Sequence, residues 1–204
     1  MTKIINISIG AVLVALLAAA GILVYFYLQP TSQASQKLER DLKMWQDHLK
    51  SEPDDALARA NLGVIYREMG DIESATRELA LAVELEPEGY TYITELALTY
   101  RQMGDTESAL EHLKRAIDLY PNGEKFRAQY LVAEIYFESG DLESAKEFLQ
   151  QSLEDNNTKW NSHYLMGQLY EREGNLEKAR EEYGVAAVFN EDDEELQEAL
   201  RRVS

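Results

Sequence analysis

Apolar residues follow two different patterns along this chain. Between Ile9 and Leu28 they form a run of 20 positions that contains no charged residue. From Lys37 onward they recur at spacings of three and four, which place apolar side chains on one face of a helix. The first such set is Leu38, Leu42, Trp45 and Leu49. The pattern therefore predicts an all-α fold with a long apolar helix at the amino terminus.

The amino-terminal run has the length of a membrane span. As a helix it measures about 30 Å, the thickness of the hydrocarbon core of a bilayer. Aromatic residues at 25–27 and Lys3 suit the two membrane interfaces. We predict a transmembrane signal-anchor helix over residues 4–28. A cleaved signal peptide is the alternative, because residues 18–20 are three small alanines, but the chain stays apolar beyond them.

The flanks of the predicted span favour one orientation. Lys3 precedes it, whereas residues 29–36 after it are polar and uncharged. This asymmetry favours an amino terminus inside the cytoplasm and the remainder of the chain outside. Within the span, Ala11, Ala15 and Ala19 form a stripe of small residues suited to contact with another membrane helix. We predict that residues 29–36 are a linker to a second region, residues 37–204.

A hexapeptide recurs through the second region. Gly-Asp-x-Glu-Ser-Ala begins at Gly70, Gly104 and Gly140, and an altered copy begins at Gly174, so the spacings are 34, 36 and 34 residues. Glycine accepts the left-handed backbone that ends a helix, and Asp or Asn next to it caps the helix that follows. Each copy is therefore predicted to be a turn between two antiparallel helices, in a stack of repeated helix pairs.

Other positions keep the same period. A large apolar residue, a small residue and a tyrosine precede each turn: Leu62, Gly63 and Tyr66; Leu96, Ala97 and Tyr100; Val132, Ala133 and Tyr136; Met166, Gly167 and Tyr170. A small, a large and a small residue follow it: Ala75, Leu79 and Ala82; Ala109, Leu113 and Ala116; Ala145, Leu149 and Ser152; Ala179, Tyr183 and Ala186. Prolines 53, 87 and 121 are also 34 residues apart.

These positions resemble the tetratricopeptide repeat (TPR) family, whose unit of about 34 residues folds as a helix pair. The resemblance implies an α-solenoid of stacked TPR helix pairs. It divides the second region into a half unit (37–53), full units at about 56–89, 90–123, 126–159 and 160–191, and a capping helix (192–203). A two-residue insertion within 122–125 accounts for the spacing of 36.

Charge and composition exclude several functions. From Lys37 onward the chain has 19 basic and 37 acidic residues, a net charge of −18. This argues against a nucleic-acid-binding protein, which needs a basic surface. The absence of cysteine excludes disulfides, cysteine-bound metals and thiol catalysis.

We expect no catalytic, metal or cofactor site. The three histidines, His48, His112 and His163, show neither metal-ligand spacing nor a neighbouring nucleophile motif. The glycines mark helix turns rather than a loop that binds phosphate. The sequence therefore predicts a protein without enzymatic activity and without a cofactor.

The TPR resemblance implies a binding groove lined by the first helix of each pair. By repeat phase the groove positions are Asn61, Val64, Arg67, Thr94, Leu98, Arg101, Tyr130, Glu134, Phe137, Tyr164, Gln168 and Arg172. Each of these is also compatible with an ordinary helix-surface residue. As a set, Arg67 and Arg101 are expected to hold a carboxylate or backbone carbonyls of a partner. Tyr130, Phe137 and Tyr164 are expected to form an apolar anchor pocket.

The architecture resembles membrane-anchored bacterial envelope TPR proteins. The resemblance implies a single-pass protein of the bacterial inner membrane whose TPR region lies outside the cytoplasm. Its expected function is to bind an extended peptide or helix of a protein partner, as a scaffold or adaptor in secretion, maturation or assembly of an envelope complex. A permanent structural subunit of a membrane complex is the alternative.

Overall fold

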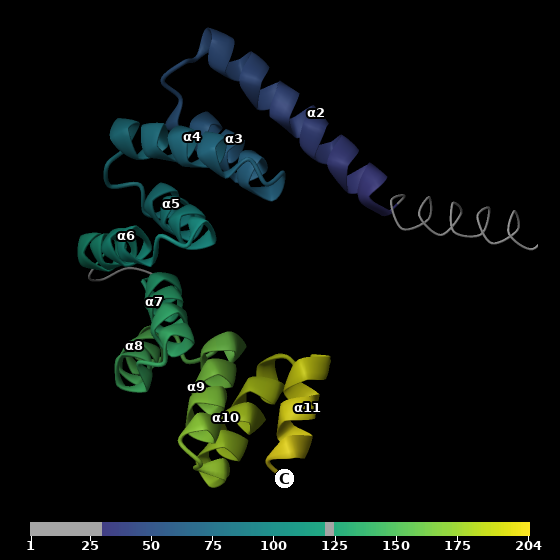
Figure 1. Cartoon of the computed structure of the whole chain (residues 1–204), viewed down its shortest axis with the longest axis vertical. Helices are drawn as coiled ribbons and strands as arrows, with labels where there is room; N and C mark the ends of the chain where they lie inside the picture. Colours follow the sequence, from purple (N-terminus) through teal and green to yellow (C-terminus); the bar gives the residue numbers. More distant parts are fainter. Residues whose placement is uncertain (1–29, 121–124) are drawn as a thin grey trace, which may run out of the picture. The chain divides into compact units, whose positions relative to one another are not determined.

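The computed structural model describes residues 30–120 and 125–204 (Figure 1). Within these ranges the chain forms ten helices and no strand. It divides into two units, Met1–Pro53 and Asp54–Ser204. The described part of the first unit is the single helix α2 (Pro30–Ser51), and the second unit contains α3 to α11.

Helix α2 includes most of the residues that were predicted to be a linker. It begins at Pro30, so residues expected to be a linker over 29–36 are helical from residue 30 onward. A proline in the first helical position loses no helix hydrogen bond, and the glutamines and alanine after it are compatible with a helix. The predicted span at residues 4–28, with Ala11, Ala15 and Ala19, lies outside the described residues. In the ranges that are described, no helix is both long and apolar enough to cross a membrane.

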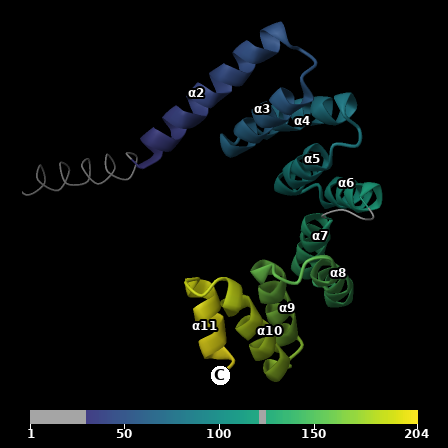
Figure 2. The same ribbon diagram turned by 180° about the vertical axis from the view of Figure 1, so that it is seen from behind.

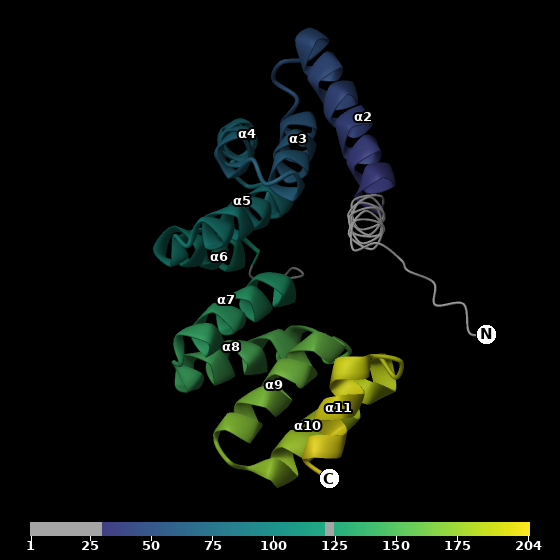
Figure 3. The same cartoon turned by 45° about the vertical axis from the view of Figure 1, so that its right-hand side comes forward.

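The second unit is a succession of antiparallel helix pairs (Figures 1 and 2). The pairs are α3 (Ala56–Glu68) with α4 (Ile72–Leu85), α5 (Tyr90–Met103) with α6 (Thr106–Leu119), α7 (Phe126–Ser139) with α8 (Leu142–Asp155), and α9 (Trp160–Arg172) with α10 (Leu176–Phe189). Helix α11 (Glu194–Arg202) follows and lies beside α10 (Figure 3). The structure therefore has four complete helix pairs in the part of the chain that it describes.

The turns within the pairs are alike, as the hexapeptide predicts. The four glycines have φ values of 83°, 82°, 86° and 77°. In each turn the following Asp or Asn side chain accepts a hydrogen bond from the backbone N–H three residues later, at 3.1–3.2 Å. The backbone N–H of that Asp or Asn also donates to the carbonyl oxygen of the repeat's tyrosine. These bonds satisfy groups that helix ends leave unpaired, so the predicted role of the hexapeptide is confirmed.

Small residues set the distance between the helices of a pair. A Cβ atom added to Gly63 would lie 2.6 Å from Cγ of Leu79, and one added to Gly167 would lie 2.5 Å from the ring of Tyr183. Alanines 97 and 133, fully buried, occupy the same phase in the second and third pairs. The second helix can therefore press a large side chain against the backbone of the first.

The core of the second unit continues to its carboxyl end. Clusters of buried apolar residues extend from α3 and α4 through α9. A last cluster joins Tyr183 and its neighbours on α10 to Leu196, Ala199 and Val203 at α11. Helix α11 thus covers apolar side chains at the end of the helix pairs, over the residues expected to form the capping helix.

Candidate functional site

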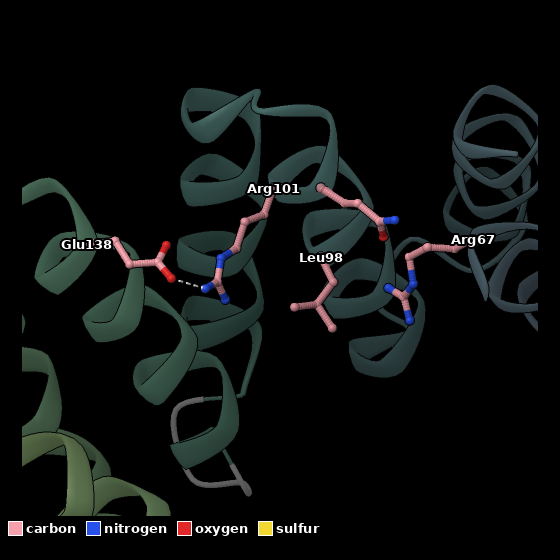
Figure 4. A pocket seen from close by; sticks show the side chains of 5 residues that line it. Arg67, Leu98, Arg101 and Glu138 are labelled. Atoms are coloured by element: carbon pink, nitrogen blue, oxygen red, sulfur yellow. Dashed lines mark hydrogen bonds and ion pairs between the residues drawn. The ribbon is translucent and has the colours of Figure 1, made fainter. Parts of the chain in front are cut away.

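One cavity gathers side chains from the first helices of three successive pairs. Its volume is about 440 Å³. It is lined by Arg67 of α3, by Leu98, Arg101 and Gln102 of α5, and by Glu138 of α7 (Figure 4). Leu98 points into the space between the two arginines. Arg67, Leu98 and Arg101 are all groove residues predicted from the repeat phase, so the structure brings these three together. We call this cavity, on the side formed by α3, α5 and α7, the first-helix site.

Other predicted groove residues line two further cavities. Phe137, Gln168 and Arg172 line a cavity of about 400 Å³ together with Glu171 and Arg202. Tyr130 lines one of about 250 Å³ between the starts of α7 and α9. The twelve predicted positions are therefore distributed over separate cavities and surfaces.

Thr94 was wrongly expected to face the groove. Its side chain is fully buried, and its hydroxyl donates to the carbonyl oxygen of Thr91. Asn61 and Val64 are half-buried on α3, and the Asn61 amide donates to the carbonyl oxygen of Leu57. Each of these hydrogen bonds lies within a single helix. Repeat phase compares positions in different helices, so it does not predict such bonds.

Arg67 is already paired within the protein. Its Nη2 donates to Oε2 of Glu95 at 2.6 Å, and its Nη1 donates to the backbone oxygen of Glu95 at 3.1 Å. The carboxylate of Glu95 also accepts a bond from Arg127 on α7 at 2.9 Å. One buried carboxylate thus joins three successive pairs, through arginines on α3 and α7.

Arg101 is also paired. It donates to Glu134 and, at 2.6 Å, to Glu138, both on α7. Burial opposes the charge on Arg101, but the hydrogen bonds to Glu134 raise its pKa above the ordinary value. Both arginines were expected to bind a carboxylate or backbone carbonyls of a partner, and the structure pairs them with acidic residues of the next helix pair. They are positioned donors rather than unpaired charges.

The predicted aromatic anchor does not form one pocket. The Tyr130 hydroxyl donates to Glu134 at 3.0 Å, and burial raises the pKa of this hydroxyl well above its ordinary value. Phe137 is only 8% exposed, because the guanidinium of Arg172 lies 3.7 Å from its ring centre. Tyr164 packs instead near Trp160 and Tyr183. Tyr130 and Phe137 contact one apolar cluster but line different cavities, and Tyr164 belongs to the cluster around Tyr183, so the three rings do not form the expected pocket.

Five charged residues of this face were not predicted: Glu95, Arg127, Glu138, Glu171 and Arg202. Arg202 of α11 donates to Glu171 of α9 at 2.5 and 2.9 Å. Glu171 follows the repeat tyrosine in the fourth pair, the position of Arg67 and Arg101 in earlier pairs. Arg172, one residue later, instead donates to the backbone oxygen of Phe137 at 2.9 Å. Opposite charges 28 to 37 residues apart, on helices that neighbour each other in the stack, are the signal that would have indicated these pairs.

The histidines have structural neighbours. Nδ1 of His112 lies 2.9 Å from the backbone oxygen of Ser108, and His163 lies 2.8 Å from a carboxylate oxygen of Glu182. Among the described residues, no group of three potential ligands is placed to hold a metal ion. The site offers hydrogen-bond donors and apolar surface, which are means of recognition.

Comparison with known proteins identifies related sequences and folds. The family model described as "Tetratricopeptide repeat protein 21 C-terminal ARM domain" matches residues 15–196. The search of curated proteins finds no match.

Three solved structures illustrate the likeness of fold. A MamA structure is 20% identical, with a TM-score of 0.65 over 79% of this chain and 93% of that one. YrrB, described as a TPR protein with an unusual peptide-binding site, is 22% identical, with a TM-score of 0.61 over 87% and 89%. Pseudomonas aeruginosa PilF is 18% identical, with a TM-score of 0.75 over 88% and 81%. At these identities the likeness shows the fold.

Proposed function

Since the chain belongs to the family described as the tetratricopeptide repeat protein 21 C-terminal ARM domain, we propose that it is a non-catalytic scaffold that binds a protein partner. The TPR resemblance of the sequence is thereby confirmed. The observation that carries the proposal is the first-helix site, where three groove residues predicted from repeat phase line one cavity. The occupant is an extended segment of the partner.

The chemistry of the first-helix site suits a peptide backbone. A guanidinium has five N–H donors, and the contacts with Glu95, Glu134 and Glu138 use two on each arginine. The other donors of Arg67 and Arg101 serve the carbonyl oxygens of the segment. Leu98, which lies between the two arginines (Figure 4), contacts one of the segment's apolar side chains. Because the ion pairs hold both arginines in place, little side-chain entropy is lost when the segment binds.

We further propose that residues 4–28 anchor the scaffold in a membrane, with the repeats outside the cytoplasm. The uncharged run from Ile9 to Leu28 supports the anchor, and the charge asymmetry beside it supports the orientation. The corresponding role is in secretion, maturation or assembly of an envelope complex. YrrB is described as having a peptide-binding site, and a peptide is the occupant proposed for this chain as well.

Site-specific photo-crosslinking in intact cells tests the binding face. Gln102 is exposed and lines the first-helix site, whereas Gln150 is exposed on α8 and lines none of the three cavities. A photoreactive residue at Gln102 should yield one discrete protein adduct, and the same residue at Gln150 should not yield that adduct. Adducts of equal strength at both positions, or none at Gln102, would refute the proposal.

The anchor has a separate test. The full chain should stay in the membrane fraction after alkaline carbonate extraction. In a Ser35→Cys variant, a membrane-impermeant maleimide should label the thiol in preparations where the external face of the membrane is accessible. Release by carbonate rejects the anchor, and labelling only after the membrane is opened rejects the orientation.

A further inference from the structure

The end of α10 exposes apolar side chains. Val188 is 78% exposed, Phe189 47% and Val185 39%. Residues three and four apart are neighbours on a helix surface, so Val185 adjoins both Val188 and Phe189. A Cβ atom added to Gly184, four residues before Val188, would meet no atom within 4 Å. We call Gly184, Val185, Val188 and Phe189 the α10 patch.

The other repeats show that the exposed Val188 is unusual. At the phase of Val188 the first three pairs carry Glu84, Asp118 and Glu154, all exposed. At the phase of Val185 the second and third pairs carry Arg115 and Gln151. The position of Val188 is thus charged in the other pairs and apolar on α10. The phase of Val185 carries Leu81 in the first pair, and the phase of Phe189 carries Leu85 and Leu119 in the first two pairs. Repeat packing does not require an apolar residue at the position of Val188, since the other pairs pack without one.

Val188 also lies opposite the buried face of its helix. Ala179, Tyr183 and Ala186 are fully buried in the contacts with α9 and α11. At 100° per residue, Val188 lies on the other side, in line with Glu177 and Glu181. Glu191 and Asp192 follow the helix at its carboxyl end. The patch is therefore an apolar surface with acidic residues before and after it.

Charge selects the class of partner for this surface. A second copy of the chain would bring acidic residues to the same place, with a net charge of −18 from Lys37 onward on each copy. Like charges oppose association, whereas a basic segment is attracted to the acidic residues around the patch. We propose that the α10 patch binds a helical segment of a protein partner whose apolar stripe is flanked by Lys or Arg. This surface is separate from the first-helix site, so either proposal can fail without the other.

Two labelled helical peptides test this inference with the full chain. Both carry the same leucine stripe, and their polar faces carry lysine in one and glutamate in the other. Fluorescence anisotropy at about 0.15 M salt, where surface charges are largely screened beyond about 8 Å, should show binding of the lysine peptide only. Val188→Ser with Phe189→Ser should weaken that binding about tenfold or more, because the apolar contact is lost.

The variants separate apolar contact from charge attraction. Val188→Glu with Phe189→Asp gives α10 the residues of α8 and adds two negative charges, yet it should also weaken binding about tenfold. If charge attraction alone caused the binding, the two added negative charges would instead tighten it. Leu119→Ser, at the phase of Phe189 on α6, is the matched control and should leave affinity within about twofold. If a double variant melts at a lower temperature than the wild type, Val188→Ser alone, at the most exposed position, replaces it in the binding measurement.

Several results would overturn the proposal. These are no binding of the lysine peptide, equal binding of both peptides, or unchanged or tighter binding by the Glu/Asp variant. Sedimentation velocity provides a further check on the occupant. A concentration-dependent dimer that the serine variant abolishes would identify a second copy as the occupant, and would reject the basic partner.

Discussion

The turns within the helix pairs and the contacts between the pairs follow different rules. The four turns are almost copies of one another, with glycine at φ between 77° and 86° and an Asp or Asn cap. The polar contacts between successive first helices differ at every junction. Glu95 joins Arg67 to Arg127, Arg101 binds two glutamates, and Arg172 covers Phe137.

The difference follows from the range of the interactions. A turn is closed by residues within a few positions of one another, so one short motif specifies it wherever it occurs. A junction joins side chains about one repeat apart, and several charge arrangements satisfy the same backbone. The stack thus keeps a constant spacing while its binding face varies from pair to pair.

Among the changes that test this comparison, removing the charge of Glu95 should lower the stability of the protein most. Glu95→Gln leaves the half-buried Arg67 without its carboxylate, and should lower the free energy of unfolding by about 2–3 kcal/mol. The midpoint of urea unfolding measures the change. Glu138→Gln is the control, because its carboxylate is 58% exposed in its pair with Arg101 and should cost less than about 1 kcal/mol. Equal losses would mean that burial does not distinguish the two junctions.

A substitution in a turn should have the next largest effect. Gly140→Ala forces an alanine into the left-handed region, at φ 86°, and should cost about 1–2 kcal/mol. Gly184→Ala is the matched control within α10, where the added Cβ meets no atom and should stabilise the protein by about 0.4–1 kcal/mol. Thermal unfolding followed by circular dichroism measures both. A loss at both positions would show that the left-handed backbone is not the cause.

The smallest change in stability should come from a change of pH. The hydrogen bond to Glu182 raises the pKa of His163 above its ordinary value of 6.5, although burial opposes this. Because the folded-state pKa is the higher one, the contribution of His163 to stability is complete below the ordinary value and disappears as pH rises through the raised value. The difference in Tm between the wild type and His163→Gln should therefore be larger at acidic pH than at alkaline pH. In a Glu182→Gln background this pH dependence should vanish, and its persistence would assign it to another group.

Repeat phase was the limit of what the sequence could predict about the binding face. Phase placed Arg67, Leu98 and Arg101 together correctly, because positions one repeat apart lie on neighbouring first helices. The expected groove also included Thr94, which the structure buries and which lies one position before Glu95, the phase of Asn61. Repeat phase also did not identify the acidic residues that bind the two arginines, because it does not specify which carboxylate of the next pair reaches them.

The sequence by itself determined the helix pairs, their period and their turns. Gly-Asp and the small-large-small pattern act over a few residues or across one pair, where backbone sterics leave few solutions. Only the tertiary structure decided which charges pair, that Arg172 covers Phe137, and that Val188 remains exposed on α10. Those outcomes depend on distances between helices that are about 34 residues apart in the chain. The sequence allows many pairings at that separation, and the reach and burial of the side chains decide which of them form.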